Sequence, residues 1–167
     1  MTEQLSQSFE FKPMTESDLP LFHVWLNRPH VAEWWDERTG LQDVREIYLP
    51  LLNSKSSAQC YFAQLNEAPV GFIQSYNVVA QQSSGWWLDE TDPNAVGIDQ
   101  FLADAENPGK GVETEMVRQF AKLLFQDPAV TKIRTDPSPT NPRAIRCYEK
   151  PDFAESGSSI HRTDRSY

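Results

Sequence analysis

Three stretches of the chain carry residues whose chemistry needs an explanation. Gly109-Lys110-Gly111 stands between a predicted strand and a predicted helix, where backbone N–H groups and the helix dipole can hold a pyrophosphate. Asp99 lies in an otherwise apolar strand, and a carboxylate there is costly unless something pairs with it. Asp136 ends the next strand, where ligand sites of open α/β sheets gather. Each stretch also has an ordinary explanation: a plain loop, a strand-end carboxylate facing water, and a turn or N-cap aspartate.

Other kinds of chemistry find less support in the residue types and their spacing. The glycine turn follows the fourth predicted strand rather than the first, which argues against a Rossmann fold, and it lacks the full phosphate-loop pattern. His23, His30 and His161 form no ligand spacing, and no serine-histidine-aspartate arrangement emerges. We therefore expect neither a metal ion nor a covalent nucleophile.

Composition and charge limit the partners. The chain has 167 residues, enough for one domain with its own core. Fifteen basic and 24 acidic residues give a formal charge of −9, which repels nucleic acid and anionic membranes and attracts a polycation, although charge of this size also simply keeps a domain soluble.

The sequence also predicts a cytoplasmic protein. The first residues contain neither a basic segment nor an apolar segment of the kind found in signal peptides, and no apolar run approaches the roughly 18 residues that span a bilayer. Cys60 and Cys147 are far apart and match no metal-ligand spacing, so we interpret both as free thiols in a reducing compartment.

Hydrophobic periodicity predicts alternating strands and helices that place these residues. The predicted strands span residues 9–13, 61–65, 70–76, 95–102 and 130–135, with the fourth near the centre of the sheet. The predicted helices span residues 15–26, 29–35, 41–52, 111–127 and 141–150. A turn at residues 66–69 joins the second and third strands into an antiparallel hairpin, and residues 81–85 form a loop.

Two tryptophan pairs lie in segments where core residues are unusual. Trp34 and Trp35 end the short predicted helix, and Trp86 and Trp87 follow the polar loop. At least one member of each pair belongs to the core, so we propose only Trp35 and Trp86 as walls of a ligand pocket.

A family resemblance rests on the segment from Asn141 to Lys150. This segment, Asn-Pro-Arg-Ala-Ile-Arg-Cys-Tyr-Glu-Lys, resembles the Asn-x-x-Ala-x-x-x-Tyr-x-Lys helix of the GNAT acetyltransferase superfamily. Longer strings, among them Glu33-Trp34-Trp35, Gly97-Ile98-Asp99-Gln100 and residues 130–139, are similar to the aminoglycoside 6′-N-acetyltransferases of types Ib and II. The similarity runs from about Phe9 to Lys150.

The resemblance implies an α/β domain with the GNAT acyl-CoA N-acyltransferase fold, in which helices flank a central mixed, mostly antiparallel sheet. One such domain is expected over residues 1–167, with a disordered N-terminus at residues 1–8 and an atypical tail at residues 151–167. The implied reaction is direct transfer in a ternary complex, in which the acceptor amine attacks acetyl-CoA without an acyl-enzyme. Acetyl-CoA is the expected co-substrate, an aminoglycoside or other cationic amine is the expected partner, and a monomer or homodimer is expected.

The resemblance also assigns roles around the acceptor. Asp99 matches the acidic residue beside the acceptor amine and is the expected general base, directly or through water. Tyr148 matches the tyrosine near the thioester sulfur and is the expected proton donor to the thiolate. Asp136 matches a carboxylate that holds ammonium groups of the acceptor. The expected lining of the acceptor pocket is Trp35, Tyr48 and Trp86.

Cofactor contacts follow from the same resemblance. Gly109, Lys110 and Gly111 match the pyrophosphate loop, and Asn141 matches the asparagine that contacts the pantetheine arm. Buried ammonium groups of an acceptor need partners, and each charge-assisted hydrogen bond is worth about 1.5–3 kcal/mol. The acidic composition therefore fits such an acceptor.

Four positions depart from the family pattern. Glu113 replaces a glycine and puts a negative charge into the first turn of the helix, which lowers cofactor affinity if its side chain turns inward. Pro108 replaces a non-proline residue before the loop. Ser56 and Ser84 stand where close relatives carry acidic pocket residues. We therefore expect lower affinity for the acceptor or a different range of acceptors.

The tail departs more strongly. After Lys150, relatives continue with Ala-Gly-Phe and later a Thr-Pro-Asp-Gly-Pro turn before a last strand, whereas this chain reads Pro151-Asp152-Phe153. With suitable codons, one shifted frame restores both strings. We hypothesise a one-nucleotide insertion or deletion near the codon for Lys150, which the gene sequence would reveal. The polar residues 156–162 are poor strand formers, so an unpaired edge of the sheet and a less stable domain are expected.

Two alternatives to aminoglycoside acetylation stay open from the sequence. The enzyme could acetylate a different amine, such as a polyamine, a siderophore hydroxylamine or a peptide amine. Alternatively, the chain is a C-terminally altered remnant that is weakly active, or that binds ligands without turnover.

Overall fold

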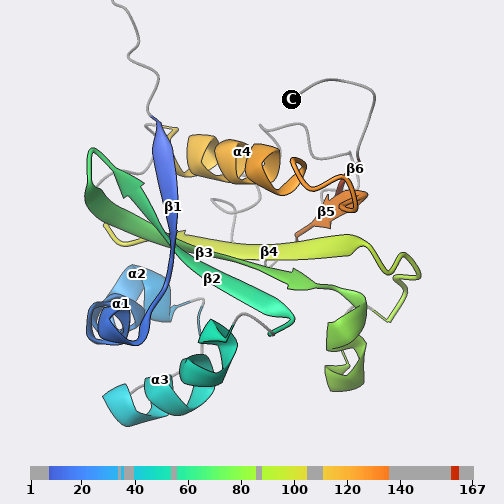
Figure 1. The fold of residues 1–167 in the computed structure, drawn as a ribbon. Coiled ribbons are helices and arrows are strands. Elements are labelled where there is room, and N and C mark those ends of the chain that lie inside the picture. The colour runs from blue at the N-terminus through green and yellow to red at the C-terminus, as the bar shows by residue number, and fades with distance from the viewer. Residues whose placement is uncertain are drawn as a thin grey trace, which may run out of the picture.

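Six strands form a single mixed sheet in the computed structural model (Figure 1). The structure describes residues 8–33, 35, 40–53, 56–85, 88–104, 111–135 and 159–161. The strands are β1 Phe9–Pro13, β2 Ala58–Leu65, β3 Ala68–Asn77, β4 Ala95–Leu102, β5 Lys132–Arg134 and β6 Ser159–His161, and they lie in that order. All neighbours are antiparallel except β4 and β5, which are parallel.

Helices cover both faces of the sheet. The long helix α4, Val112–Leu124, makes the parallel crossover from β4 to β5 and lies on one face (Figure 1). The opposite face carries the helices α1 Leu19–Leu26, α2 Pro29–Ala32 and α3 Leu41–Tyr48. Short 3-10 segments complete the fold at Glu16–Asp18, Leu49–Leu52 and Val79–Ser84. In the part of the chain that is described, no helix is long and apolar enough to cross a membrane.

The alternation of side chains along β4 assigns its residues to two cores. Ile98 packs on the α4 side with Val117 and Phe120. Phe101 packs on the other side, in the cluster that includes Phe22 of α1. Because successive side chains of a strand point to opposite faces, Gly97 and Asp99 lie on the same face as Phe101. Asp99 therefore faces the α1–α3 side of the sheet.

Several predicted elements are confirmed with altered ends. The capping box is present, since the Thr15 N–H donates to Asp18 Oδ2 at 2.8 Å, but the first turn is a 3-10 turn and α1 begins at Leu19. The helix predicted at residues 41–52 is α-helical only to Tyr48 and continues as a 3-10 segment. Pro50 lacks the N–H that would continue the α-helical ladder.

The hairpin turn is tighter than predicted. Asn66 and Glu67 have φ angles of 50° and 66°, as a two-residue type I′ turn requires, so β3 begins at Ala68 instead of Val70. The polar loop at residues 81–85 belongs largely to a 3-10 segment, and the fifth strand is shorter than predicted. The helix predicted at residues 141–150 lies outside the described residues.

The expectation of an unpaired edge beside β5 is wrong. Residues 159–161 of the tail pair with β5 in antiparallel register, with Lys132, Ile133 and Arg134 opposite the three tail residues. Edge strands need little intrinsic propensity when a backbone ladder is available, so a polar tail can cover β5.

We predict that Gly71→Ala destabilises the sheet. A Cβ atom at Gly71 would lie 2.8 Å from the backbone carbonyl oxygen of Phe101 and 3.3 Å from Met116 Sδ, so β4 would have to move. The expected loss of about 1–3 kcal/mol in the free energy of unfolding outweighs the entropic benefit of alanine. Urea unfolding measures it, with exposed Lys12→Ala on β1 as the control. Equal midpoints for the two variants would contradict the close approach of β3 and β4.

Candidate active site

Asp99 is tied to the neighbouring strand by a side-chain hydrogen bond. Gln74 of β3 is its register partner, and Gln74 Nε2 donates to Asp99 Oδ2 at 3.1 Å. The carboxylate is only partly buried. This hydrogen bond fixes the orientation of the Asp99 carboxylate on the face of the sheet.

The hydrogen-bonded row continues across the sheet to β2. Cys60 stands opposite Gln74, and its Sγ lies 3.8 Å from Gln74 Oε1. Because an ionised carboxylate can only accept hydrogen bonds, the amide nitrogen must face Asp99 and the amide oxygen must face the thiol. The buried thiol thus helps to orient the amide that positions Asp99.

Trp35 packs against the next pair of cross-strand side chains on the same face of the sheet, Phe72 of β3 and Phe101 of β4. Its ring meets Phe72 and Phe101 edge-on, with centroid distances of 5.6 and 5.2 Å, and it is only partly buried. Phe101 is two residues from Asp99, so this tryptophan stands one side-chain row away from the carboxylate. The structure therefore brings together two of the residues predicted around the acceptor.

Tyr48 lies deeper than its predicted place in the pocket lining. Only 2% of its surface is exposed. Its ring packs edge-on against those of Phe22 and Phe72, with distances between ring centroids of 4.6 and 6.3 Å. In the described part of the chain, Tyr48 supports the aromatic layer on which Trp35 rests. Its contact with an acceptor remains a prediction.

Tyr76 belongs to the same face and was not among the predicted site residues. It is the register partner of Gly97, and a Cβ atom on Gly97 would lie 2.3 Å from the tyrosine ring. The glycine leaves room for this ring next to Asp99. A glycine within an apolar strand is a signal for such a close approach and could have directed attention to Tyr76.

The N-terminus of α4 meets the opposite face of β4. Gly111 is the N-cap and has a left-handed conformation with φ of 71°, and no atom of the described residues lies within 4 Å of the position of a Cβ atom there. An exposed glycine at the start of a 13-residue helix is a suitable element for holding a phosphate through backbone N–H groups. The predicted role of Gly111 in binding pyrophosphate is compatible with this position.

The side chain of Glu113 is held by the sheet. Its Oε1 atom accepts a hydrogen bond of 2.8 Å from Nε2 of Gln100, and Gln100 is buried on the α4 face of β4. Glu115 is engaged separately by Arg118 at 2.7 Å, which lowers the pKa of Glu115 through a hydrogen bond. Both acidic side chains of the first turn thus have local partners. Since Gln100 follows Asp99 directly, the helix N-terminus and the carboxylate lie on the two sides of one segment of β4.

The edge of β4 beyond Gly97 belongs to the candidate site together with the Asp99 face and the α4 N-terminus. β5 pairs with β4 only at Ala95, Val96 and Gly97, whereas β4 runs on to Leu102. No described strand continues this pairing, so an extended ligand with amide groups can follow the strand edge. This edge connects the α4 N-terminus with the face that carries Asp99, which fits the pantetheine arm of acetyl-CoA.

A buried carboxylate next to this face was also not selected from the sequence. Glu90 is only 5% exposed, and its Oε1 lies 2.9 Å from Lys132 Nζ and 3.3 Å from Arg134 Nη1. Its Oε2 accepts the backbone N–H groups of Thr91 and Asp92 at 3.0 and 3.1 Å. Burial alone would raise the pKa of Glu90, but the hydrogen bond from Lys132 and the other partners lower it below its ordinary value. Glu90 is therefore ionised at neutral pH.

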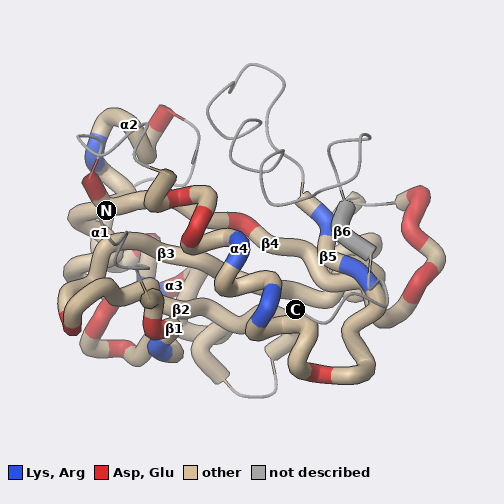
Figure 2. The backbone as a smooth tube through the Cα atoms, turned by 90° about the horizontal axis from the view of Figure 1, so that it is seen from above, with Lys and Arg blue, Asp and Glu red and all other residues tan. Residues whose placement is uncertain are grey.

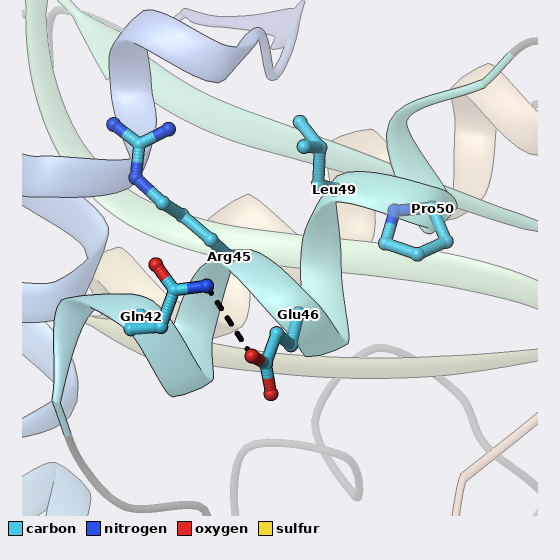
Figure 3. Close-up of a pocket in the computed structure, with 5 residues that line it drawn as sticks. All are labelled: Gln42, Arg45, Glu46, Leu49 and Pro50. Atoms are coloured by element: carbon cyan, nitrogen blue, oxygen red, sulfur yellow. Dashed lines mark hydrogen bonds between the residues drawn. The ribbon is translucent and has the colours of Figure 1, made fainter.

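A separate groove lies on the outer surface of α3 (Figure 3). Its lining residues are Gln42, Arg45, Glu46, Leu49 and Pro50. The polar side chains bond nearby groups, Gln42 to Glu46 at 3.2 Å and Arg45 to Glu16 at 2.9 Å. None of these residues was predicted for the site, and we assign the groove no chemistry.

Six predicted site residues lie outside the described residues. They are Trp86, Gly109, Lys110, Asp136, Asn141 and Tyr148. Their assigned roles stay predictions from the resemblance.

The sequence profile of the acetyltransferase (GNAT) domain matches residues 14–159. The chain is 50% identical over 155 residues to aminoglycoside N(6′)-acetyltransferase type 1 of Klebsiella pneumoniae. The matched residues cover 91% of this chain and 77% of that protein. It is also 61% identical over 72 residues to a kanamycin resistance protein of Rhizobium radiobacter, covering 43% of this chain and 67% of that protein.

Solved structures agree with the sequence comparisons. The aminoglycoside acetyltransferase AAC(6′)-Ib in complex with coenzyme A superimposes with a TM-score of 0.85 at 47% identity, covering 93% of this chain and 95% of that one. The same values hold for its complex with coenzyme A and kanamycin. The mixed sheet, the crossover helix and these similarities lead to one conclusion: the chain belongs to the GNAT acetyltransferases and, within them, to the family of aminoglycoside 6′-N-acetyltransferases.

Proposed function

We propose that this protein transfers the acetyl group of acetyl-CoA to the 6′-amino group of aminoglycosides and thereby confers resistance to them. The observation that carries the proposal is the position of Asp99. It is held by Gln74 on an aromatic face, beside the part of the β4 edge with which no described strand pairs, and on the same strand segment that meets the α4 N-terminus. The similarity to acetyltransferases with this acceptor supports the same assignment.

Acetyl-CoA supplies an acetyl thioester as the electrophile. In our proposal Gly109, Lys110 and Gly111 hold its pyrophosphate, and Asn141 contacts its pantetheine arm. The conformation of Gly111 and the edge of β4 beyond Gly97 fit such a ligand. The bond between Gln100 and Glu113 supports this fit, because it directs the carboxylate toward the sheet.

Asp99 prepares the acceptor for attack. Amines of aminoglycosides are largely protonated near neutral pH, so the nucleophile must first lose a proton. Asp99 accepts this proton, directly or through a water molecule, while Gln74 keeps its carboxylate oriented. As the new C–N bond forms and the C–S bond breaks, Tyr148 donates a proton to the departing thiolate. Asp136 binds a second ammonium group, and Trp35 with Trp86 packs against the sugar rings.

A pair of acceptors tests the proposed function. The protein is expected to release CoA thiol with an aminoglycoside that carries a 6′-amine and not with one that carries a 6′-hydroxyl. Thiol release with polyamines or peptide amines alone would point to a different acceptor class. Binding of acetyl-CoA in calorimetry without release in any assay would overturn the enzymatic proposal in favour of an inactive remnant.

Asp99→Asn tests the general base. The amide has the same shape but cannot take up the proton, so the turnover number is expected to fall by about 10²–10⁴-fold, while the Kd for acetyl-CoA stays within about twofold. Steady-state kinetics and calorimetry measure the two quantities. Glu67→Gln, an exposed change of the same kind at the hairpin turn, is the control. An unchanged turnover number would remove Asp99 from the mechanism.

Glu113→Gln tests the charge at the α4 N-terminus. Glu113 is the second residue of the helix, where a negative charge competes with a phosphate for the positive end of the dipole. The variant keeps an acceptor oxygen for Gln100 and is expected to bind CoA about two- to fivefold more tightly, as removal of roughly 0.3–1 kcal/mol of repulsion implies. Calorimetry measures this, again against Glu67→Gln. Equal or weaker binding would mean that the bond to Gln100 already removes the effect of the charge on the ligand.

A further inference from the structure

Two cations stand on the acceptor face of the sheet. Arg134 of β5 is the register partner of Gly97, and Lys132 is the partner of Ala95. Ile133, between them, is fully buried in the cluster of the α4 side, so Lys132 and Arg134 point to the opposite face, which is the face of Asp99.

The distance to the general base is short. Strands lie about 4.8 Å apart and rise about 3.3 Å per residue, so the Cα atoms of Arg134 and Asp99 are roughly 8 Å apart. That distance is within one Debye length at physiological ionic strength. Uncompensated cations there would repel a polycationic acceptor at the place where Asp99 must receive it.

Acidic residues of the preceding segment compensate these charges. Glu90 contacts both Lys132 and Arg134, and exposed Asp89 lies 3.5 Å from Arg134. Figure 2 shows the basic positions of β5 next to the acidic stretch that leads into β4. Among the described residues, two carboxylates thus face two cations, and their charges balance. The side chains of Lys132 and Arg134 are only 20% and 14% exposed, so water screens them weakly.

We propose that Glu90 is a specificity-determining residue: it cancels the charges of Lys132 and Arg134 at the acceptor face and so allows polycationic amines to reach Asp99. The inference rests on the proposed function and names a determinant of its acceptor class. Glu90 acts on the binding of the acceptor through its charge. It does not take part in the transfer of the acetyl group.

The main test compares Glu90→Gln with the native protein. The amide keeps the shape and one acceptor oxygen but removes one negative charge, so that Asp89 is the one described carboxylate left beside the two cations. The KM for a tetracationic aminoglycoside is expected to rise about 5- to 30-fold, and less for a 6′-amino acceptor with fewer ammonium groups. The Kd for acetyl-CoA is expected to be no weaker. Raising the salt concentration from about 0.05 to 0.5 M should shrink the difference in KM.

A second pair of variants separates charge from anchoring. In Glu90→Gln/Arg134→Gln one cation is removed together with the carboxylate, so the KM for the acceptor is expected to return to within about threefold of the native value, although an ion pair is lost. If Glu90 only anchors the segment before β4, the double variant will be at least as impaired as the single one, and that result would overturn the inference.

Arg134→Gln alone keeps the test decisive if Glu90→Gln does not fold. With Glu90 intact, loss of one cation is expected to lower the KM for the polycationic acceptor, whereas an increased KM would refute the charge argument. Glu16→Gln is the matched control, because Glu16 also forms an ion pair, with Arg45 at 2.9 Å, and its loss changes the net charge equally.

If the native protein itself acetylates no aminoglycoside, the proposed function fails. A native protein that acetylates normally, with Glu90→Gln unchanged, refutes only the role of Glu90.

Discussion

The fold depends on the unequal pairing of the two edges of β4. One edge is paired with β3 from Val96 to Leu102, whereas the other is paired with β5 at only three residues. A parallel neighbour requires a crossover helix, and this crossover places the N-terminus of α4 beside the same part of β4. The β4 edge beyond Gly97, the α4 N-terminus and Asp99 therefore lie close together, because in the described part of the chain β5 pairs with only the first part of β4.

Much of this arrangement could be predicted from the sequence. The strand around Asp99 and the helix after Gly111 follow from hydrophobic periodicity and a glycine signal, and both are present in the structure. The element ends were less predictable, because Pro50 converts a helix end into a 3-10 segment and Asn66 with Glu67 makes a tighter turn. The roles of the family residues came from resemblance, since spacing alone did not distinguish a functional Asp99 from an ordinary strand-end carboxylate.

Three residues near the candidate site were not predicted from the sequence, for one physical reason. Gln74, Tyr76 and Glu90 become important through their cross-strand and cross-segment partners. A one-dimensional pattern does not contain strand register, and a polar residue acquires its role only when register sets its neighbour. The tail shows the same limit, because a segment with weak strand propensity pairs with β5 once the backbone ladder of that strand is available.

The short pairing of β5 has a consequence for local unfolding. Three residues on each side provide few backbone hydrogen bonds, so the anchoring of this strand relies on buried Ile133 and on the contacts of its two cations with Glu90. The stabilisation from Glu90 is complete above the pKa of an unfolded glutamate and is lost as pH falls through the lower pKa of the folded state. In acid, β5 thus loses the ionic part of its anchoring. Opening would begin there as a sub-global fluctuation, while the four-stranded antiparallel part of the sheet stays protected from hydrogen exchange.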